Sequence, residues 1–324
     1  MQGSEPTGAW AALKEIGLCG VDFSSAPSRR KPIMIAEGSL DAQAEGSLDA
    51  QAEGSRYAQA EGSLDARAEG NLRGVVARPQ LRWHNLVACS DWHSFASYLR
   101  RPGPRLGAFD LPFGLPRDLL CAWGWDHLDH RAISARFAQG DRAGWIAQLK
   151  SFCAARPPGQ KFAHRACDLP VGSSPSMKWV NPPVVFMYRE GFARILEAGW
   201  LLPGFDDLAQ AFASPSEVRL AVETYPGALA RKLIGRLSYK ADDALRQTGA
   251  RREARQKIVD GISSLSGIAL HLDAEQQKAV LDDARGDTLD ALLCLVIAAR
   301  CAVRGPPRWG APLDADPLEG WIAQ

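Results

Sequence analysis

The sequence has no apolar stretch that could cross a membrane. Its longest uncharged apolar run is the nine residues Ala291–Ala299, whereas a helical span needs about 20. The N-terminus has neither a basic head nor an apolar core, so no secretory signal is expected. The seven cysteines form no CxxC pair, and an odd, scattered set is typical of a reducing compartment. With 46% hydrophobic residues among 324, the chain can bury a large core. We therefore expect a soluble, cytoplasmic, globular protein without a membrane partner, and no pattern indicates its oligomeric state.

The signatures of three common enzyme classes are missing as well. There is no GxxxxGK(S/T), no GxGxxG after a strand and no GxSxG. These absences disfavour a P-loop enzyme, a dinucleotide oxidoreductase and a nucleophile-elbow hydrolase. Any chemistry is therefore expected from residues that are scattered along the chain.

An acidic repeat of eight residues occupies positions 36–70. The units read AEGSLDAQ, AEGSLDAQ, AEGSRYAQ and AEGSLDAR, and a partial AEGNLRG follows. Eight acids and two arginines give this segment a net charge of −6, so the other 289 residues carry +7 against +1 for the whole chain. A stacked solenoid is one interpretation. Each unit offers little apolar surface, however, so we expect a weakly ordered acidic insertion in a loop between two strands.

The rest of the chain predicts a single α/β domain over 18–324, after an N-terminal extension, 1–17. The order is three strands, helix, strand, helical segment, strand and helices, which is typical of a mixed sheet flanked by helices. The Pro-rich, mostly helical segment 117–215 is expected to elaborate this domain. The expected strands are 18–25, 31–36, 80–90, 105–109 and 219–223, and the expected helices are 91–101, 227–237, 250–264, 274–284 and 287–303.

Four acidic residues stand where the pattern otherwise predicts burial. Asp22 lies in the first strand, Asp110 and Glu223 close the strands at 105–109 and 219–223, and Asp290 lies inside an apolar helix. An ionised carboxylate removed from water needs a cation, strong hydrogen bonds or a raised pKa. If the four converge, a divalent cation satisfies them together. Mg²⁺ and Mn²⁺ prefer carboxylate oxygens and water, and two such ions can flank a phosphodiester.

A fifth acid, Asp287, lies three residues before Asp290 and so shares its helix face. Because it follows Gly286, it could instead cap the helix N-terminus. The sequence leaves both roles open.

Several stretches together resemble a known family. They are GVDFSSAP with KPI, GAFDLPFGLPR, SPSMKWVNPPV, VETYPGALAR, SYK, GDTLDALLC and the terminal EGWI. They resemble the family called domain of unknown function 429, whose members are predicted RNase H-like nucleases. The resemblance runs from about residue 18 to 322, apart from the acidic eight-residue repeats (octads). The resemblance implies an RNase H-like, RuvC-like fold with a carboxylate metal site.

The resemblance also implies a function and roles for the acids. It implies a hydrolase, a nuclease that cleaves nucleic-acid phosphodiester bonds with Mg²⁺ or Mn²⁺ in a two-metal mechanism. Asp22 and Asp290 would hold the metal, and Asp110 and Glu223 would complete its shell and orient the attacking water. Asp287 joins Asp290 as a metal ligand, because GDTLDALLC resembles the last helix of RuvC-type resolvases, where two acids three apart lie beside the metal.

Basic residues are candidate contacts to a nucleic-acid partner, DNA or RNA. The segment 229–257 holds nine basic residues against three acids, which could bind phosphates or form a solvated helix face. Trp179 is a candidate for stacking on a base. His127 and His130 have helical spacing but no third ligand, so a surface helix is favoured over a metal site. The candidate substrate-binding residues are Lys178, Arg117, Lys240, Arg251, Arg252 and Arg255.

Two other functions stay open. GVDFSS resembles the first phosphate loop of actin-like kinases, which share the superfold, but no Asp-x-Gly-Gly-type loop follows residue 200. The chain could also be a non-catalytic nucleic-acid-binding module that kept the fold. The presence of all four acids favours the nuclease over both.

Overall fold

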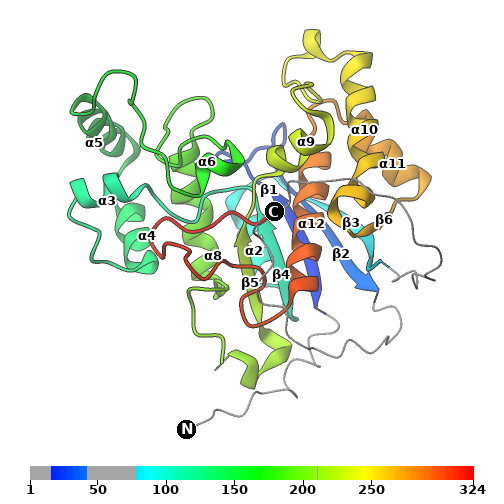
Figure 1. Cartoon of the computed structure of the whole chain (residues 1–324), viewed down its shortest axis with the longest axis horizontal. Coiled ribbons are helices and arrows are strands. Elements are labelled where there is room, and N and C mark those ends of the chain that lie inside the picture. Colours follow the sequence, from blue (N-terminus) through cyan, green and yellow to red (C-terminus); the bar gives the residue numbers. More distant parts are fainter. Residues whose placement is uncertain (1–15, 42–77, 210) are drawn as a thin grey trace, which may run out of the picture.

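The computed structural model describes residues 16–41, 78–209 and 211–324 (Figure 1). At its centre lies a six-stranded mixed sheet with the strand order β5-β4-β1-β2-β3-β6. The pairs β1–β2 and β2–β3 are antiparallel, and the pairs β1–β4, β4–β5 and β3–β6 are parallel. The strands are β1 (Gly17–Asp22), β2 (Ile33–Asp41), β3 (Gln80–Cys89), β4 (Arg105–Phe109), β5 (Arg219–Glu223) and β6 (Ala269–His271).

Helices flank the sheet, as Figure 1 shows. The segment between β4 and β5 is mostly short helices and loops, and the two longest helices, α10 and α12, follow β5. The α-helices are α2 (Trp92–Leu99), α3 (Arg117–Ala122), α4 (His130–Gln139), α5 (Arg142–Ala154), α6 (Asp168–Val171), α7 (Val184–Met187), α8 (Ala193–Glu197), α9 (Pro226–Ile234), α10 (Gly249–Ser266), α11 (Ala274–Asp282) and α12 (Asp287–Arg304). A π-helical turn, η1 (Tyr188–Phe192), joins α7 to α8, and three 3₁₀ turns are η2 (Ala211–Ala213), η3 (Pro215–Glu217) and η4 (Ala244–Arg246).

Alternating side chains of the strands contribute to two cores, one on each face of the sheet. Leu18 of β1 packs with α9, α10 and α12, whereas its neighbour Cys19 packs with α2 and the helices between β4 and β5. The two faces are thus covered by different parts of the chain. Between them, the edge of the sheet at which β1, β4 and β5 end stays open.

The close contact between α12 and β1 depends on Gly20. A Cβ at this position would lie 2.0 Å from the backbone nitrogen of Leu295 and 2.3 Å from the carbonyl oxygen of Ala291. No side chain fits there, so the helix backbone rests directly on the strand. This contact brings the first turn of α12 beside the end of β1.

The α/β order and the mixed sheet confirm the sequence-based fold class. Two details differ. β2 continues to Asp41, so the first residues of the octad segment, 36–41, are strand; they continue the alternation of buried positions, Ala36 and Gly38. β6 was not predicted, because its three residues are too short for a periodic pattern. The other octads lie outside the described residues.

Within the described ranges, no helix is both long and apolar enough to span a membrane.

Candidate functional site

Three of the predicted acids lie at one edge of the sheet. β1, β4 and β5 are parallel neighbours, so their carboxyl ends meet at this edge, where open α/β sheets bind ligands. Asp22 ends β1, Asp110 follows β4 and Glu223 ends β5. The N-terminus of α12 adds Asp287 and Asp290 at the same place. The five acids, distant in sequence, therefore converge.

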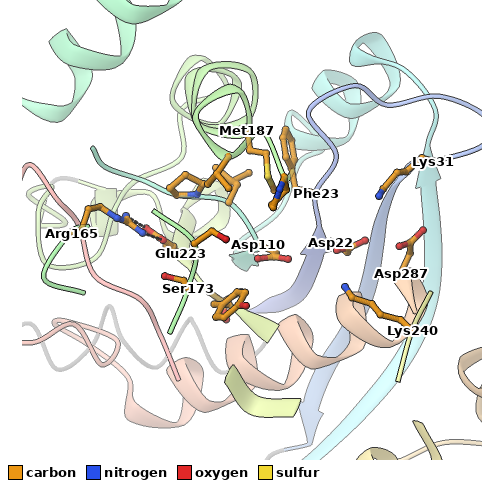
Figure 2. Close-up of a pocket in the computed structure, with 17 residues that line it drawn as sticks. Asp22, Phe23, Lys31, Asp110, Arg165, Ser173, Met187, Glu223, Lys240 and Asp287 are labelled. Atoms are coloured by element: carbon orange, nitrogen blue, oxygen red, sulfur yellow. Dashed lines mark hydrogen bonds and ion pairs between the residues drawn. The ribbon is translucent and has the colours of Figure 1, made fainter. Parts of the chain in front are cut away.

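A pocket of about 320 Å³ opens at this edge. Asp22, Asp110, Glu223 and Asp287 line it, and Figure 2 shows Asp22 and Asp110 next to each other. Asp290 is not among the lining residues, and its side chain is buried. It nevertheless lies close enough to raise the pKa of both Asp22 and Asp110.

The carboxylates of Asp22 and Asp110 have no direct partner in the pocket, although the nearby charge of Lys240 opposes the rise of both pKa values. Among the described residues, neither carboxylate makes an ion pair or a hydrogen bond. Burial raises the pKa of Asp110 to about 7, with the negative charge of Asp290 as the next cause. Burial, and then the charges of Asp290 and Asp110, raise the pKa of Asp22 well above its ordinary value. A cation beside these two groups would reverse both shifts.

Asp290, in contrast, has partners. The Tyr239 hydroxyl donates to its Oδ1 at 2.7 Å, and the Lys240 ammonium forms an ion pair with Oδ2. The charge of Asp290 in turn raises the pKa of Lys240, so this ammonium stays charged at neutral pH. Lys240 also lines the pocket, and Figure 2 places it opposite Asp22. It supplies one positive charge to a cluster of carboxylates.

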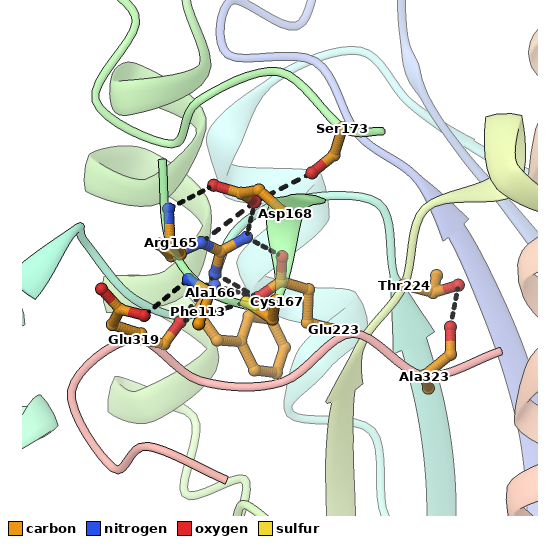
Figure 3. Close-up of polar contacts among 10 residues, drawn as sticks. All are labelled: Phe113, Arg165, Ala166, Cys167, Asp168, Ser173, Glu223, Thr224, Glu319 and Ala323. Carbon is orange, nitrogen blue, oxygen red and sulfur yellow. Dashed lines mark hydrogen bonds and ion pairs between the residues drawn. The ribbon is translucent and has the colours of Figure 1, made fainter. Parts of the chain in front are cut away.

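Glu223 is held by an arginine. The Arg165 guanidinium donates to both of its carboxylate oxygens, from Nη2 to Oε1 at 2.5 Å and from Nη1 to Oε2 at 2.7 Å (Figure 3). The backbone N–H of Phe113 donates to Oε2 at 2.8 Å. Arg165 is 1% exposed and also contacts Asp168, from Nη2 to Oδ1 at 2.8 Å. Both oxygens of Glu223 are thus engaged, which makes it a positioning group in this structure.

Asp287 is not the cap of α12. No side chain caps this helix at Gly286, and the Asp283 carboxylate accepts the Thr288 N–H at 2.8 Å. The Asp287 side chain is left to line the pocket, where burial and the charge of Asp283 raise its pKa, and Lys31 and Lys240 oppose that rise.

Of the predicted substrate-binding residues, the structure brings Lys240 alone to this pocket. Arg117 forms an ion pair with Asp316 at 2.6 Å between Nη2 and Oδ2. Lys178 donates from Nζ to the carbonyl oxygen of Asn181 at 2.7 Å. Arg117 thus joins the start of α3 to the C-terminal segment, and Lys178 bonds within its own loop.

The three arginines of α10 also lie away from the pocket lining. Arg251 donates to the Ser238 hydroxyl and Arg252 to the Asp282 carboxylate, each at 3.2 Å. Arg255 differs from the sequence-based expectation most, because it is 3% exposed. Its donors bond the carbonyl oxygens of Leu281, at 2.6 and 3.0 Å, and Tyr239, at 2.7 Å. It therefore fixes the loop that carries Tyr239 and Lys240.

The aromatic and histidine candidates are also accounted for. Trp179 is buried, with its ring 5.1 Å from that of Phe162, so its faces are not open to a base. His130 begins α4 and lies 3.6 Å from Asp206. His127 precedes that helix, so the two histidines do not share a helical turn.

The sequence-based reasoning missed Lys31, Arg165 and Tyr239. Lys31 is exposed at the mouth of the pocket, and Figure 2 shows its ammonium on the side of Asp22 and Asp287. These residues stand in loops without periodicity, and only folding brings them to the acids. The SYK stretch was the one visible signal, and it contains Tyr239 with Lys240.

The donor chemistry of the site suits a hydrated divalent cation. Across the described ranges, no group of three or more His, Cys, Asp or Glu side chains is arranged to hold a metal ion by itself. Mg²⁺ is commonly bound through one or two carboxylates and several waters. The unpaired carboxylates of Asp22 and Asp110, with Asp287 at the rim, provide such oxygens. The residues present therefore fit Mg²⁺ or Mn²⁺.

A family model matches residues 64–309, and the chain belongs to that family, described as "Protein of unknown function (DUF429)". The matched range contains Asp110, Glu223, Asp287 and Asp290, and Asp22 precedes it. Comparison with curated proteins and comparison with solved structures each found no match.

Proposed function

We propose that this protein is a nuclease that uses Mg²⁺ or Mn²⁺ to hydrolyse phosphodiester bonds of DNA or RNA. The observation that carries the proposal is the pair of half-buried, unpaired carboxylates that line the pocket, Asp22 and Asp110, with the buried Asp290 behind them. Such a cluster of like charges is unfavourable unless it binds a cation or takes up protons, and a bound cation lets the carboxylates stay ionised at neutral pH. Polyanionic phosphodiesters are substrates whose cleavage a carboxylate-bound divalent ion can assist.

We also propose that the fold is RNase H-like. Its support is the sheet itself, with three antiparallel strands, β1, β2 and β3, followed by β4, parallel to β1, and β5, parallel to β4. The carboxylates at the ends of β1 and β4, together with α12 against β1, support this proposal.

In this proposal, Asp22 and Asp110 hold the metal, with Asp290 and Asp287 on its α12 side. When bound, the ion supplies Lewis-acid polarisation of the phosphate and lowers the pKa of a bound water. The ammonium groups of Lys240 and Lys31 bind phosphate oxygens at the mouth of the pocket. Tyr239 orients Asp290 through its hydroxyl. Arg165 binds the Glu223 carboxylate and opposes the rise in its pKa that burial causes. Glu223 fixes the turn after Asp110 by accepting the Phe113 N–H.

The test is cleavage of labelled single-stranded and duplex DNA and RNA by the full chain, with Mn²⁺ and with chelator. We expect Asp22→Asn and Asp110→Asn to reduce metal-dependent cleavage at least about a hundredfold, since each removes a charged oxygen donor. Asp126→Asn is the matched control, because Asp126 is exposed and remote from the pocket lining. Undiminished cleavage by the Asp22→Asn protein would refute the assignment. Nucleic-acid binding without metal uptake or cleavage would favour the non-catalytic module.

A further inference from the structure

The pocket that holds the acids also has an apolar wall. Phe23, Leu111, Pro112, Pro182, Val184 and Met187 line it. In Figure 2, Phe23 and Met187 lie together on the side of Asp110 away from α12. A phosphate group is fully polar and gains nothing from such a wall. The wall therefore points to a second, apolar part of the ligand, adjacent to the phosphate.

The surrounding packing fixes this wall in place. The Phe23 ring meets the Phe95 ring edge-on, with 5.6 Å between the ring centroids. On another side, the Phe23 ring packs against the backbone of Gly191, where a Cβ would lie 2.6 Å from Phe23 Cζ. Met187 ends α7 at the start of the π-helical turn η1. Such turns are rare and occur frequently at functional sites. Met187 is half-buried, and its flexible thioether adapts well to a flat aromatic surface.

Hydroxyl groups with unused hydrogen-bonding capacity stand around the same pocket. Ser174 and Tyr225 line it, and within the described part of the chain neither hydroxyl makes a hydrogen bond. The neighbouring Ser173 hydroxyl, in contrast, donates to Asp168 Oδ1 at 2.8 Å. An apolar wall with a few polar groups at its edge is the usual composition of a site for a flat heterocycle.

From this arrangement we infer that the pocket takes one unstacked nucleobase beside the scissile phosphate. The inference rests on the proposed nuclease function and names its substrate class, a single-stranded or locally unpaired nucleic acid. The volume of about 320 Å³ is at the small end for ligand pockets and suits one base, not a stacked pair in a duplex. Enzymes that enclose a base take it out of the stack, which costs least where the strand is already unpaired.

The experiment measures binding of a short fluorescent single strand, as DNA and as RNA, to the full-length, non-cleaving Asp22→Asn protein. The matched probe has the same backbone with abasic residues in place of the internal bases. Base stacking supports the affinity for the intact probe, so we expect it to bind about tenfold more tightly than the abasic probe. Met187→Trp, which fills the pocket, is expected to abolish this preference. Val180→Trp is the matched control, since Val180 is exposed in the preceding loop and does not line the pocket.

Equal affinity for intact and abasic probes would overturn the inference, and this comparison needs no second substitution. Equal effects of Met187→Trp and Val180→Trp, with unchanged circular dichroism, would overturn it as well. Cleavage by the unsubstituted protein is measured in parallel. If intact and abasic strands are cleaved at equal rates, the base pocket alone is overturned. If no metal-dependent cleavage is seen, the nuclease proposal is overturned.

Discussion

Asp110 couples the chemistry of the pocket to the stability of the fold. Its pKa is raised from 3.8 to about 7, so between these two values the folded state binds more protons than the unfolded state. By linkage, the free energy of unfolding then falls as the pH rises from about 4 to about 7. The metal-free protein is stabilised at acidic pH by this group and destabilised at neutral pH.

We therefore predict that Asp110→Asn stabilises the metal-free protein at pH 8, by ~1–4 kcal/mol. The amide removes the half-buried charge of Asp110 without changing the shape of the side chain. The gain should be much smaller at pH 4.5, where the carboxyl is protonated in the folded state. Urea unfolding at the two pH values measures both. A gain that is independent of pH, or shared by Asp126→Asn, would contradict the electrostatic explanation.

Arg165 leads to a second prediction at the scale of residues. Arg165→Met leaves the buried carboxylates of Glu223 and Asp168 without their cation, and breaking such a pair costs about 3–5 kcal/mol. We expect a loss of unfolding free energy of that order, measured by urea denaturation. Arg246→Met is the control, because the Arg246 side chain is 76% exposed and 3.7 Å from Asp243, where a pair contributes at most about 1 kcal/mol. Equal losses would mean that the Arg165 pair contributes no more than a surface pair.

Some residues of the site could be predicted from the sequence, and others could not. Asp22 and Asp110 were predictable, because an acid within or after an apolar strand demands a physical explanation. Arg165 was not, since it is recognised by its partner Glu223, 58 positions away, and nothing near it in sequence is periodic. Arg255 was misjudged because its neighbours on α10 are exposed and basic, while its own side chain turns inward to two carbonyl oxygens.

Among the elements, the contact between β1 and α12 governs the site, because both carry its acids. We predict that Gly20→Ala destabilises the protein by at least ~1–3 kcal/mol, since overpacking against a helix backbone forces α12 away from the strand. Gly249→Ala is the matched control. A Cβ there meets nothing within 4 Å at the start of α10, so it should stabilise by ~0.4–1 kcal/mol. Thermal unfolding compares them, and a neutral Gly20→Ala would show that the helix can shift freely.

Elements with a strong hydrophobic pattern were predictable from the sequence, and elements without one were not. The apolar run of α12 and the strands β1, β4 and β5 each carry a strong hydrophobic signal, and their predicted bounds lie within a few residues of the observed ones. β6 has three residues and forms because β3 presents a partner edge. The last residues of β2, 36–41, read as part of an acidic repeat, but their pairing with β3 makes them a strand.

At the scale of the whole molecule, metal binding should stabilise the folded chain. A ligand that binds the folded state alone adds about 2.7 kcal/mol at a concentration a hundredfold above its Kd. We predict that Mn²⁺ raises the melting temperature at pH 8, and that Asp22→Asn abolishes the increase while Asp126→Asn retains it. Differential scanning calorimetry with and without chelator measures this shift. An equal increase in all three proteins would place the binding elsewhere.

The antiparallel pairing of β2 and β3 places one end of this hairpin far from the acids. Ile33 pairs with Cys89 near the end of β1 that carries Asp22, whereas Asp41 pairs with Gln80 at the opposite end of the hairpin. Asp41 and Gln80 thus lie at the border of the sheet remote from the pocket. Evolution can lengthen or shorten the chain there without moving a carboxylate, and an engineer could graft a reporter domain at the same point.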